Sequence, residues 1–264
     1  MRRWKARLIL LSFLCGALYF ADQRYDYFRL RGLEIAPAGI LQDTTVWQSL
    51  PRVSERFWPS LFWEKRGFAR EIEGAYPVEI RLTASGWGRY KVSIIPLEPM
   101  LYVSWNSDMW LLSKNGRMWR TDLPSNASVK GLKLPDKPIL AWDSGLATPI
   151  DPDAQGGGIF RSSLPLTKIK KWYDMLEKVG WEDDIYCVLA KKIDGRPVVQ
   201  LLLGSGDGQP GEVVLKEDTA NWSSIAAAMA KVFSGAAGPV PKGLVVNATY
   251  ADSMTFTVTS RDNR

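Results

Sequence analysis

The sequence contains no histidine, and this absence removes several classes of chemistry. Histidine is the commonest metal ligand, the usual general base at neutral pH and a member of every Ser/His/Asp or Cys/His catalytic set. The Ser-x-x-Lys motif of penicillin-binding proteins and β-lactamases is also missing from the chain. The sequence therefore shows no machinery for acyl transfer.

Cysteine is nearly absent as well. Cys15 lies in an apolar run and Cys187 far along the chain, so we expect neither a disulfide framework nor a cysteine metal cluster. Close pairs of acidic residues occur at Asp183–Asp184 and at Glu71 and Glu73, but the second pair does not share a helix face. We interpret both as solvated surface charge and predict no enzyme activity, no metal and no cofactor.

The excess of positive charge is confined to one place. Arg2, Arg3, Lys5 and Arg7 precede the first apolar run, and no acidic residue does. Without these four residues, the 34 basic residues fall to 30, against 28 acidic residues. A nucleic-acid-binding protein needs a dense basic surface for phosphates, so nucleic acid is not an expected partner.

One uncharged apolar run is present, at Leu8–Ala21. Its fourteen residues cover about 21 Å as a helix, against about 30 Å for the hydrocarbon core of a bilayer. Arg7 can extend its charge to the membrane surface. Trp4 and Tyr25 would lie about 31 Å apart on a helix, near the spacing of two interfacial aromatic belts. A single transmembrane span is therefore feasible.

Two interpretations of this run stay open. A basic segment before a short apolar run is also typical of a cleaved signal peptide, although cleavage after Ala21 would place Tyr19 where a small residue is required. Our first interpretation is a cytoplasmic tip over 1–7 and a transmembrane anchor with a juxtamembrane segment over 8–27. The basic tip then predicts a single-pass type II protein whose bulk lies outside the membrane.

The rest of the chain is expected to have an α+β fold in two domains. Residues 28–97 predict the order β-α-α-β-β, with a strand around Arg31–Gly32, helices over Thr44–Leu50 and from Leu61 to before Tyr76, and strands over Val78–Leu82 and Tyr90–Ile94. Residues 98–264 predict a mixed β domain with two covering helices. One covers Leu164–Trp181, and the other is capped by Asp218 or Thr219 and ends at Gly235.

Hairpin signals mark the second domain. Strands are expected at Leu101–Trp105 and Trp110–Leu112, and the dipeptides Asn115-Gly116 and Asp194-Gly195 favour type I′ turns. Residues 123–163 read as an irregular loop that includes three consecutive glycines. Further strands are predicted at Ile185–Leu189, Val198–Leu203, Val213–Leu215, Leu244–Thr249 and Met254–Val258.

The segment Pro96–Trp119, PLEPMLYVSWNSDMWLLSKNGRMW, resembles the FtsQ/DivIB family of bacterial cell-division proteins. The order of anchor, small domain, tryptophan-rich hairpin and terminal strand pair is similar over nearly the whole exposed chain. The resemblance implies a membrane helix, a POTRA domain and a β domain. It also implies a non-enzymatic scaffold in the bacterial inner membrane at the division septum, which binds FtsB/FtsL-like single-span proteins and coordinates septal cell-wall synthesis.

In that family the terminal strands supply an open sheet edge to which a partner segment adds as a strand, a mode that needs no catalytic residue. The resemblance implies six partner-binding residues: Val246, Asn247, Thr249, Tyr250, Phe256 and Val258. Tyr250 matches the family's tyrosine, and Thr249 stands where the family has arginine. The alternative is that Tyr250 and Phe256 pack on their own sheet.

The chain has twelve tryptophans, and exposed aromatic rings can stack on sugars. A membrane-anchored module that binds peptidoglycan or another glycan is therefore the alternative function. Trp172, Trp181 and Trp222 lie on or beside predicted apolar helix faces, and Trp105 and Trp110 lie on hairpin strands. These positions favour core packing over sugar binding.

Overall fold

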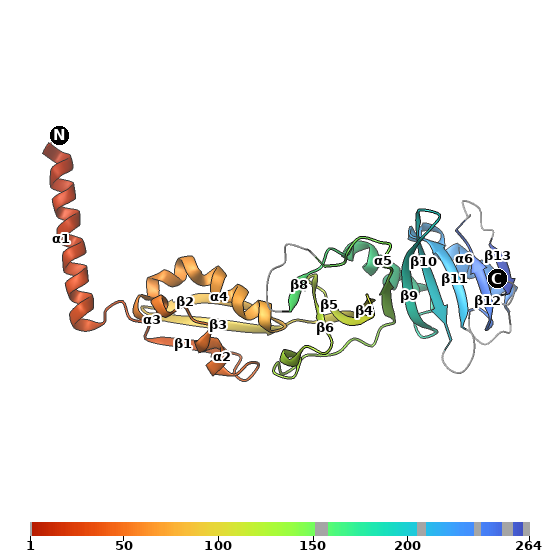
Figure 1. The fold of residues 1–264 in the computed structure, drawn as a ribbon, viewed down its shortest axis with the longest axis horizontal. Helices are drawn as coiled ribbons and strands as arrows, with labels where there is room; N and C mark the ends of the chain where they lie inside the picture. The colour runs from red at the N-terminus through yellow and green to blue at the C-terminus, as the bar shows by residue number, and fades with distance from the viewer. Residues whose placement is uncertain (1, 151–157, 205–209, 235–238, 250–255, 261–264) are drawn as a thin grey trace. The chain divides into compact units, whose positions relative to one another are not determined.

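The computed structural model has an α+β fold with one large sheet, one small sheet and several helices, as the sequence predicts (Figure 1). The structure describes residues 2–150, 158–204, 210–234, 239–249 and 256–260. The chain divides into two compact units. Unit 1 comprises Met1–Pro96 and Pro124–Gly131, and unit 2 comprises Leu97–Leu123 and Leu132–Arg264.

Unit 1 begins with the helix α1, Arg2–Tyr25. Residues 9–20 of this helix are all exposed, including Ile9, Phe13 and Phe20. Within the described residues, no helix combines the length and the apolarity needed to cross a membrane, which leaves the predicted transmembrane span unsupported.

The body of unit 1 has the predicted order of strands and helices, with two short additions. Its elements are β1 (Gly32–Ala36), α2 (Asp43–Gln48), α3 (Arg52–Arg56), the 3-10 helix η1 (Trp58–Ser60), α4 (Leu61–Ala75), β2 (Val78–Gly86) and β3 (Arg89–Pro96). The sheet order is β1-β3-β2, with β1 parallel and β2 antiparallel to β3. The additions, α3 and η1, begin next to Pro51 and Pro59, where proline restricts φ to values compatible with a helical start.

α4 supplies one layer of the unit 1 core. Leu61, Phe68 and Ile72 recur at helical spacing and are fully buried in one cluster with the strand residues Val78 and Val92. The helix ends at Ala75 because Tyr76 precedes a proline, and such a residue disfavours helical backbone angles. The 3-10 helix η2 (Pro124–Asn126) belongs to the segment that unit 1 receives from later in the chain.

Unit 2 is built on a ten-stranded sheet with the order β13-β12-β11-β10-β9-β7-β4-β5-β6-β8. Its strands are β4 (Pro99–Trp105), β5 (Asp108–Ser113), β6 (Arg117–Arg120), β7 (Ile139–Trp142), β8 (Ile159–Arg161), β9 (Ile185–Ile193), β10 (Arg196–Leu203), β11 (Gly211–Lys216), β12 (Leu244–Asn247) and β13 (Thr257–Ser260). Its helices are α5 (Leu166–Val179), the 3-10 helix η3 (Thr219–Asn221) and α6 (Trp222–Val232).

The hairpin turns agree only in part with the sequence. Asp194 and Gly195 both have positive φ, as a type I′ turn between β9 and β10 requires. At Asn115-Gly116 only Gly116 has positive φ, so the type I′ turn predicted there is wrong. The hydroxyl of Ser113 instead holds a three-residue loop by accepting from the backbone N–H of Arg117 at 2.9 Å.

The segment 123–163 is not wholly irregular, which corrects the prediction of a loop. It contains β7, which pairs in parallel with both β4 and β9, and β8, which pairs with β6 at the edge of the sheet. β7 has only four residues and no hairpin turn at either end, because both of its partners are parallel. Two of the three consecutive glycines lie outside the described residues.

The main core of unit 2 packs α5 and α6 against the sheet, as Figure 1 shows for the two helices beside the strands. Trp172 of α5 and Trp222 of α6 are almost completely buried there. Their indole N–H groups donate to the backbone carbonyls of Glu217 (2.9 Å) and Lys216 (3.1 Å), just beyond or at the end of β11. The predicted packing of these tryptophans in the core is confirmed.

Candidate partner-binding edge of the large sheet

Among the residues that the structure describes, β13 forms one edge of the ten-stranded sheet and pairs only with β12. The pairing is antiparallel, and Val246 lies opposite Val258 while Asn247 lies opposite Thr257. Residues in an edge strand alternately direct their backbone N–H and C=O groups toward the neighbouring strand and away from it. Within the described residues, half of the backbone groups of β13 therefore face outward from the sheet.

The two faces of this edge differ. Val246 is 0% exposed and lies in the main core, so its side chain faces the covering helices. Val258 shares that face but is 41% exposed because no described strand lies beyond it. Phe256, just before β13, packs against the same core. Of these three predicted partner-binding residues, only Val258 offers a largely accessible side chain.

A turn follows the end of β12. The side-chain Oδ1 of Asn247 accepts from the backbone N–H of Thr249 at 3.0 Å and from its hydroxyl at 2.7 Å. The backbone N–H of Ala248 donates to the carbonyl of Val214 in β11 at 2.9 Å. Asn247 and Thr249 are thus engaged in shaping the turn, and both remain partly exposed. Tyr250 lies outside the described residues.

The strand itself is short, uncharged and free of proline. Its sequence is Thr-Val-Thr-Ser, and all four side chains are exposed. Within the described residues, no side chain forms a hydrogen bond with this strand. Three of its residues, Thr257, Thr259 and Ser260, are not among the six predicted partner-binding residues. Apolar alternation placed the strand at 254–258 and gave no signal for its polar continuation through Thr259 and Ser260.

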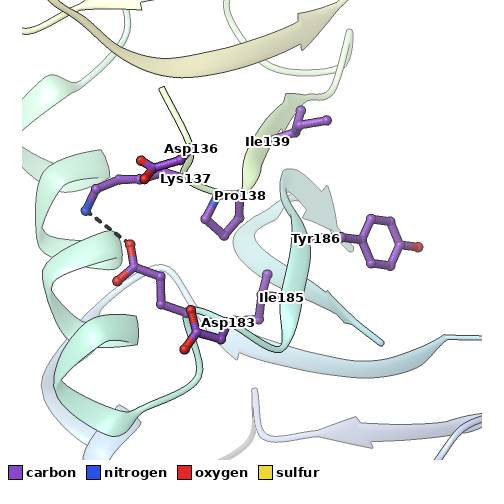
Figure 2. A pocket seen from close by; sticks show the side chains of 8 residues that line it. Asp136, Lys137, Pro138, Ile139, Asp183, Ile185 and Tyr186 are labelled. Atoms are coloured by element: carbon purple, nitrogen blue, oxygen red, sulfur yellow. Dashed lines mark ion pairs between the residues drawn. The ribbon is translucent and has the colours of Figure 1, made fainter. Parts of the chain in front are cut away.

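A pocket of about 480 Å³ lies elsewhere in unit 2, beside the starts of β7 and β9 (Figure 2). Asp136, Lys137 and Asp183 line it, together with Glu182, whose carboxylate lies 3.2 Å from the ammonium of Lys137. The pocket is thus acidic with one internal ion pair. Among the residues that the structure describes, no cluster of three or more metal-ligating side chains occurs.

Two titratable groups near this pocket are held in their neutral forms. Burial raises the pKa of the Cys187 thiol above its usual range. Burial likewise raises the pKa of Tyr173 well above its usual value, and its hydroxyl donates to the carbonyl of Pro138 at 2.8 Å. Reactive cysteines have lowered pKa values because the thiolate is the nucleophile, so Cys187 has the character of a structural residue.

Comparisons with known proteins do not assign this chain. No protein-family model matches it, and no curated protein shows significant sequence similarity. The functional argument therefore depends on the residues and their arrangement.

Proposed function

We propose that the chain is a non-enzymatic scaffold of the bacterial division machinery, of the FtsQ/DivIB type, that binds a partner by strand addition at β13. The observation that carries the proposal is an edge strand whose four side chains are all exposed and carry no charge. Such an edge presents unpaired N–H and C=O groups that a partner strand can satisfy. FtsB/FtsL-like single-span division proteins are the partners proposed.

The arrangement of unit 1 supports the same assignment. Its β-α-α-β-β order, with a three-stranded sheet and α4 against it, is the order expected of a POTRA domain. We assign unit 1 as the POTRA-like domain that assists recruitment to the septum, and unit 2 as the β domain that holds the partner. The exposed chain would then coordinate septal cell-wall synthesis through binding alone.

Attachment to the inner membrane through α1 is part of the proposal. The described side chains of residues 9–20 are exposed and mostly apolar, and such a helix requires a non-aqueous environment or a partner. Trp4 and Tyr25 are exposed near its two ends, where interfacial aromatic residues are usual. Because the uncharged stretch is short, the side chain of Arg7 would extend to the membrane surface. The bulk of the chain would then lie in the periplasm.

The test is photocrosslinking in cells, with a photoreactive amino acid placed singly at Thr257, Val258, Thr259 and Ser260. Strand addition predicts capture of a small single-span protein, identified by mass spectrometry. It also predicts a period of two along β13, because neighbouring side chains point to opposite faces. The matched control is Thr83, an exposed residue on β2, which is an edge strand of the other sheet. Equal capture from Thr83, or no capture from β13, would contradict the proposal.

Glycan binding is the second candidate because Trp47 and Trp63 of unit 1 are exposed. The buried tryptophans weaken it, since Trp110, Trp119, Trp172, Trp181 and Trp222 all lie in the cores of unit 2. A photoreactive probe at Trp63 that captures peptidoglycan, combined with silent β13 probes, would favour the glycan-binding module.

A further inference from the structure

Unit 1 carries an exposed aromatic patch that the proposed function does not use. We define the aromatic patch as four exposed residues, Tyr27, Phe57, Phe62 and Trp87, which are 40%, 41%, 54% and 47% exposed. Beneath them lie Phe28 and the buried rings of Trp58 and Tyr90. Contiguous exposed apolar surface of this kind marks a protein or membrane interaction site.

The rings form one connected cluster. The ring of Trp87 lies 4.9 Å from Tyr27 and 5.0 Å from Trp58, measured between centroids. Phe57 reaches the cluster through Phe28 at 5.5 Å. Trp58 continues to Phe62 at 5.8 Å. The patch is therefore a continuous surface drawn from three separate parts of the chain.

Hydrogen bonds to backbone carbonyls fix this surface. The indole N–H of Trp87 donates to the carbonyl of Tyr27 at 3.0 Å, and the backbone N–H of Trp58 donates to the carbonyl of Phe28 at 2.8 Å. Gly88 has a φ of +65°, and a Cβ built there would lie 3.0 Å from the carbonyl oxygen of Arg29. The turn between β2 and β3 is thus packed directly on the segment that follows α1.

The patch begins where α1 ends. Tyr27 is two residues beyond Tyr25, the last residue of the helix, so their Cα atoms are at most about 7 Å apart. From Leu8 to Tyr25, the last residue of α1, the helix rises about 26 Å at 1.5 Å per residue, close to the thickness of a hydrocarbon core of about 30 Å. If Leu8 lies near one boundary of the core, Tyr25 lies near the other, and the patch follows it directly in the chain.

Basic residues are frequent in the segments that carry the patch. The segments 22–31, 52–58 and 86–90 contain six arginines and three acidic residues: Arg24, Arg29, Arg31, Arg52, Arg56 and Arg89, with Asp22, Asp26 and Glu55. In the described part of the chain, only Arg29 of these arginines has an ion-pair partner, Asp26 at 3.6 Å. Arginine beside tryptophan and tyrosine suits the phosphate and glycerol layer of an anionic bilayer.

We infer that the aromatic patch rests in the interfacial layer of an anionic phospholipid bilayer and holds unit 1 against the membrane surface. Trp87 and Tyr27 lie at headgroup depth, and the arginines contact lipid phosphates. This inference rests on the membrane attachment in the proposed function, since it assumes that α1 brings the patch to the bilayer. It also gives a reason for the short apolar stretch of α1, because the patch adds a second contact with the membrane.

The test is a depth measurement on the full chain in vesicles of phosphatidylethanolamine with phosphatidylglycerol. A spin label is placed by Trp87→Cys in a chain with Cys15→Ser and Cys187→Ser, and its accessibility to oxygen is compared with its accessibility to an aqueous nickel chelate. The matched control is Ile95→Cys, an exposed apolar residue near the other end of β3. A label at Phe57→Cys repeats the test if the change at Trp87 disturbs folding.

We expect labels at 87 and 57 to have a higher ratio of oxygen to nickel-chelate accessibility than the label at 95. We expect this difference to disappear when phosphatidylglycerol is left out of the vesicles and Arg31 and Arg89 are changed to glutamate. Equal accessibility at 87, 57 and 95 would overturn the inference, whether a protein or a glycan then occupies the patch. A separate label on the native Cys15 reports the anchor. A lipid-buried label at 15 with aqueous labels at 87 and 57 refutes the patch alone, whereas an aqueous label at 15 refutes the attachment through α1.

Discussion

β2 and β13 are both edge strands, one in each unit, and they differ in length, charge and protection. β2 has nine residues and carries Glu79 and Arg81, whose side chains form an ion pair at 2.9 Å. The backbone N–H of Ile80 donates to the carboxylate of Glu73 at 2.8 Å, and the register shifts near Gly86. β13 has four residues, no charge and, within the described residues, no side chain bonded to it.

The difference indicates which edge is available. Charged side chains, bulges and capped N–H groups are the devices by which proteins keep an edge strand from pairing. β2 has all three, and β13 has none in the part of the chain that the structure describes. Its shortness is its one protection, because four residues cannot hold a neighbour without side-chain contacts or a partner that is already nearby.

The largest effect is expected from Val258→Pro. Proline has no N–H group, so it breaks the ladder on one side of β13 or the other. An unpaired backbone group costs about 1–3 kcal/mol, which corresponds to roughly a 5- to 160-fold loss of partner binding. Crosslinking from a fixed probe at Thr259 measures the loss. Val258→Ala keeps the N–H group and is the control, and an unchanged yield with proline would exclude strand addition.

A matched pair of lysines is expected to give a smaller effect. Val258→Lys places a charge at the edge and should reduce capture several-fold, since edge lysines oppose strand pairing. Thr83→Lys makes the same change on β2 and should leave capture unchanged. Both chains should keep the melting temperature of the parent, because both residues are exposed. Equal losses from the two substitutions would show that the edges are not different.

Removing the protection of β2 should make it resemble β13. The triple change Glu73→Ala, Glu79→Thr and Arg81→Thr frees the N–H group of Ile80 and removes the ion pair. We expect weak, concentration-dependent association, measured by sedimentation velocity. Glu71→Ala, which alters an exposed residue of α4, is the control and should sediment as the parent does. A triple variant that also sediments as the parent does would mean that charge does not decide which edge pairs.

The smallest effect is expected from Thr259→Val. The change keeps the backbone and the shape of the side chain but removes a hydroxyl on the outward face. If backbone hydrogen bonds provide most of the binding, capture should change by less than about twofold. The yield from a probe at Val258 measures it. A loss as large as that expected with proline would instead assign the binding to the threonine side chains.

Much of the fold could be predicted because the deciding signals were local. α4 was found from apolar residues at helical spacing, and the turn at Asp194-Gly195 from residues that tolerate positive φ. β7 was missed because its four residues become a central strand only through partners far away in the sequence. The edge strand was predicted to end too early because Thr259 and Ser260 do not continue the apolar alternation.

Tertiary context also decided the candidate site. Val246 and Val258 look alike in the sequence and lie opposite each other in the sheet, yet only the residue at the edge is accessible. The aromatic patch was missed for a similar reason. Its rings come from the segment after α1, the region of α3 and η1, and the turn between β2 and β3, which no sequence period connects.

The most direct measurement is amide hydrogen exchange at single-residue resolution, on the full chain alone and co-purified with the protein captured from Val258. Strand addition predicts slower exchange in the complex at the outward-facing amides of β13, in alternation, with little change along β2. Unchanged exchange throughout β13, with protection elsewhere on the chain, would contradict the account.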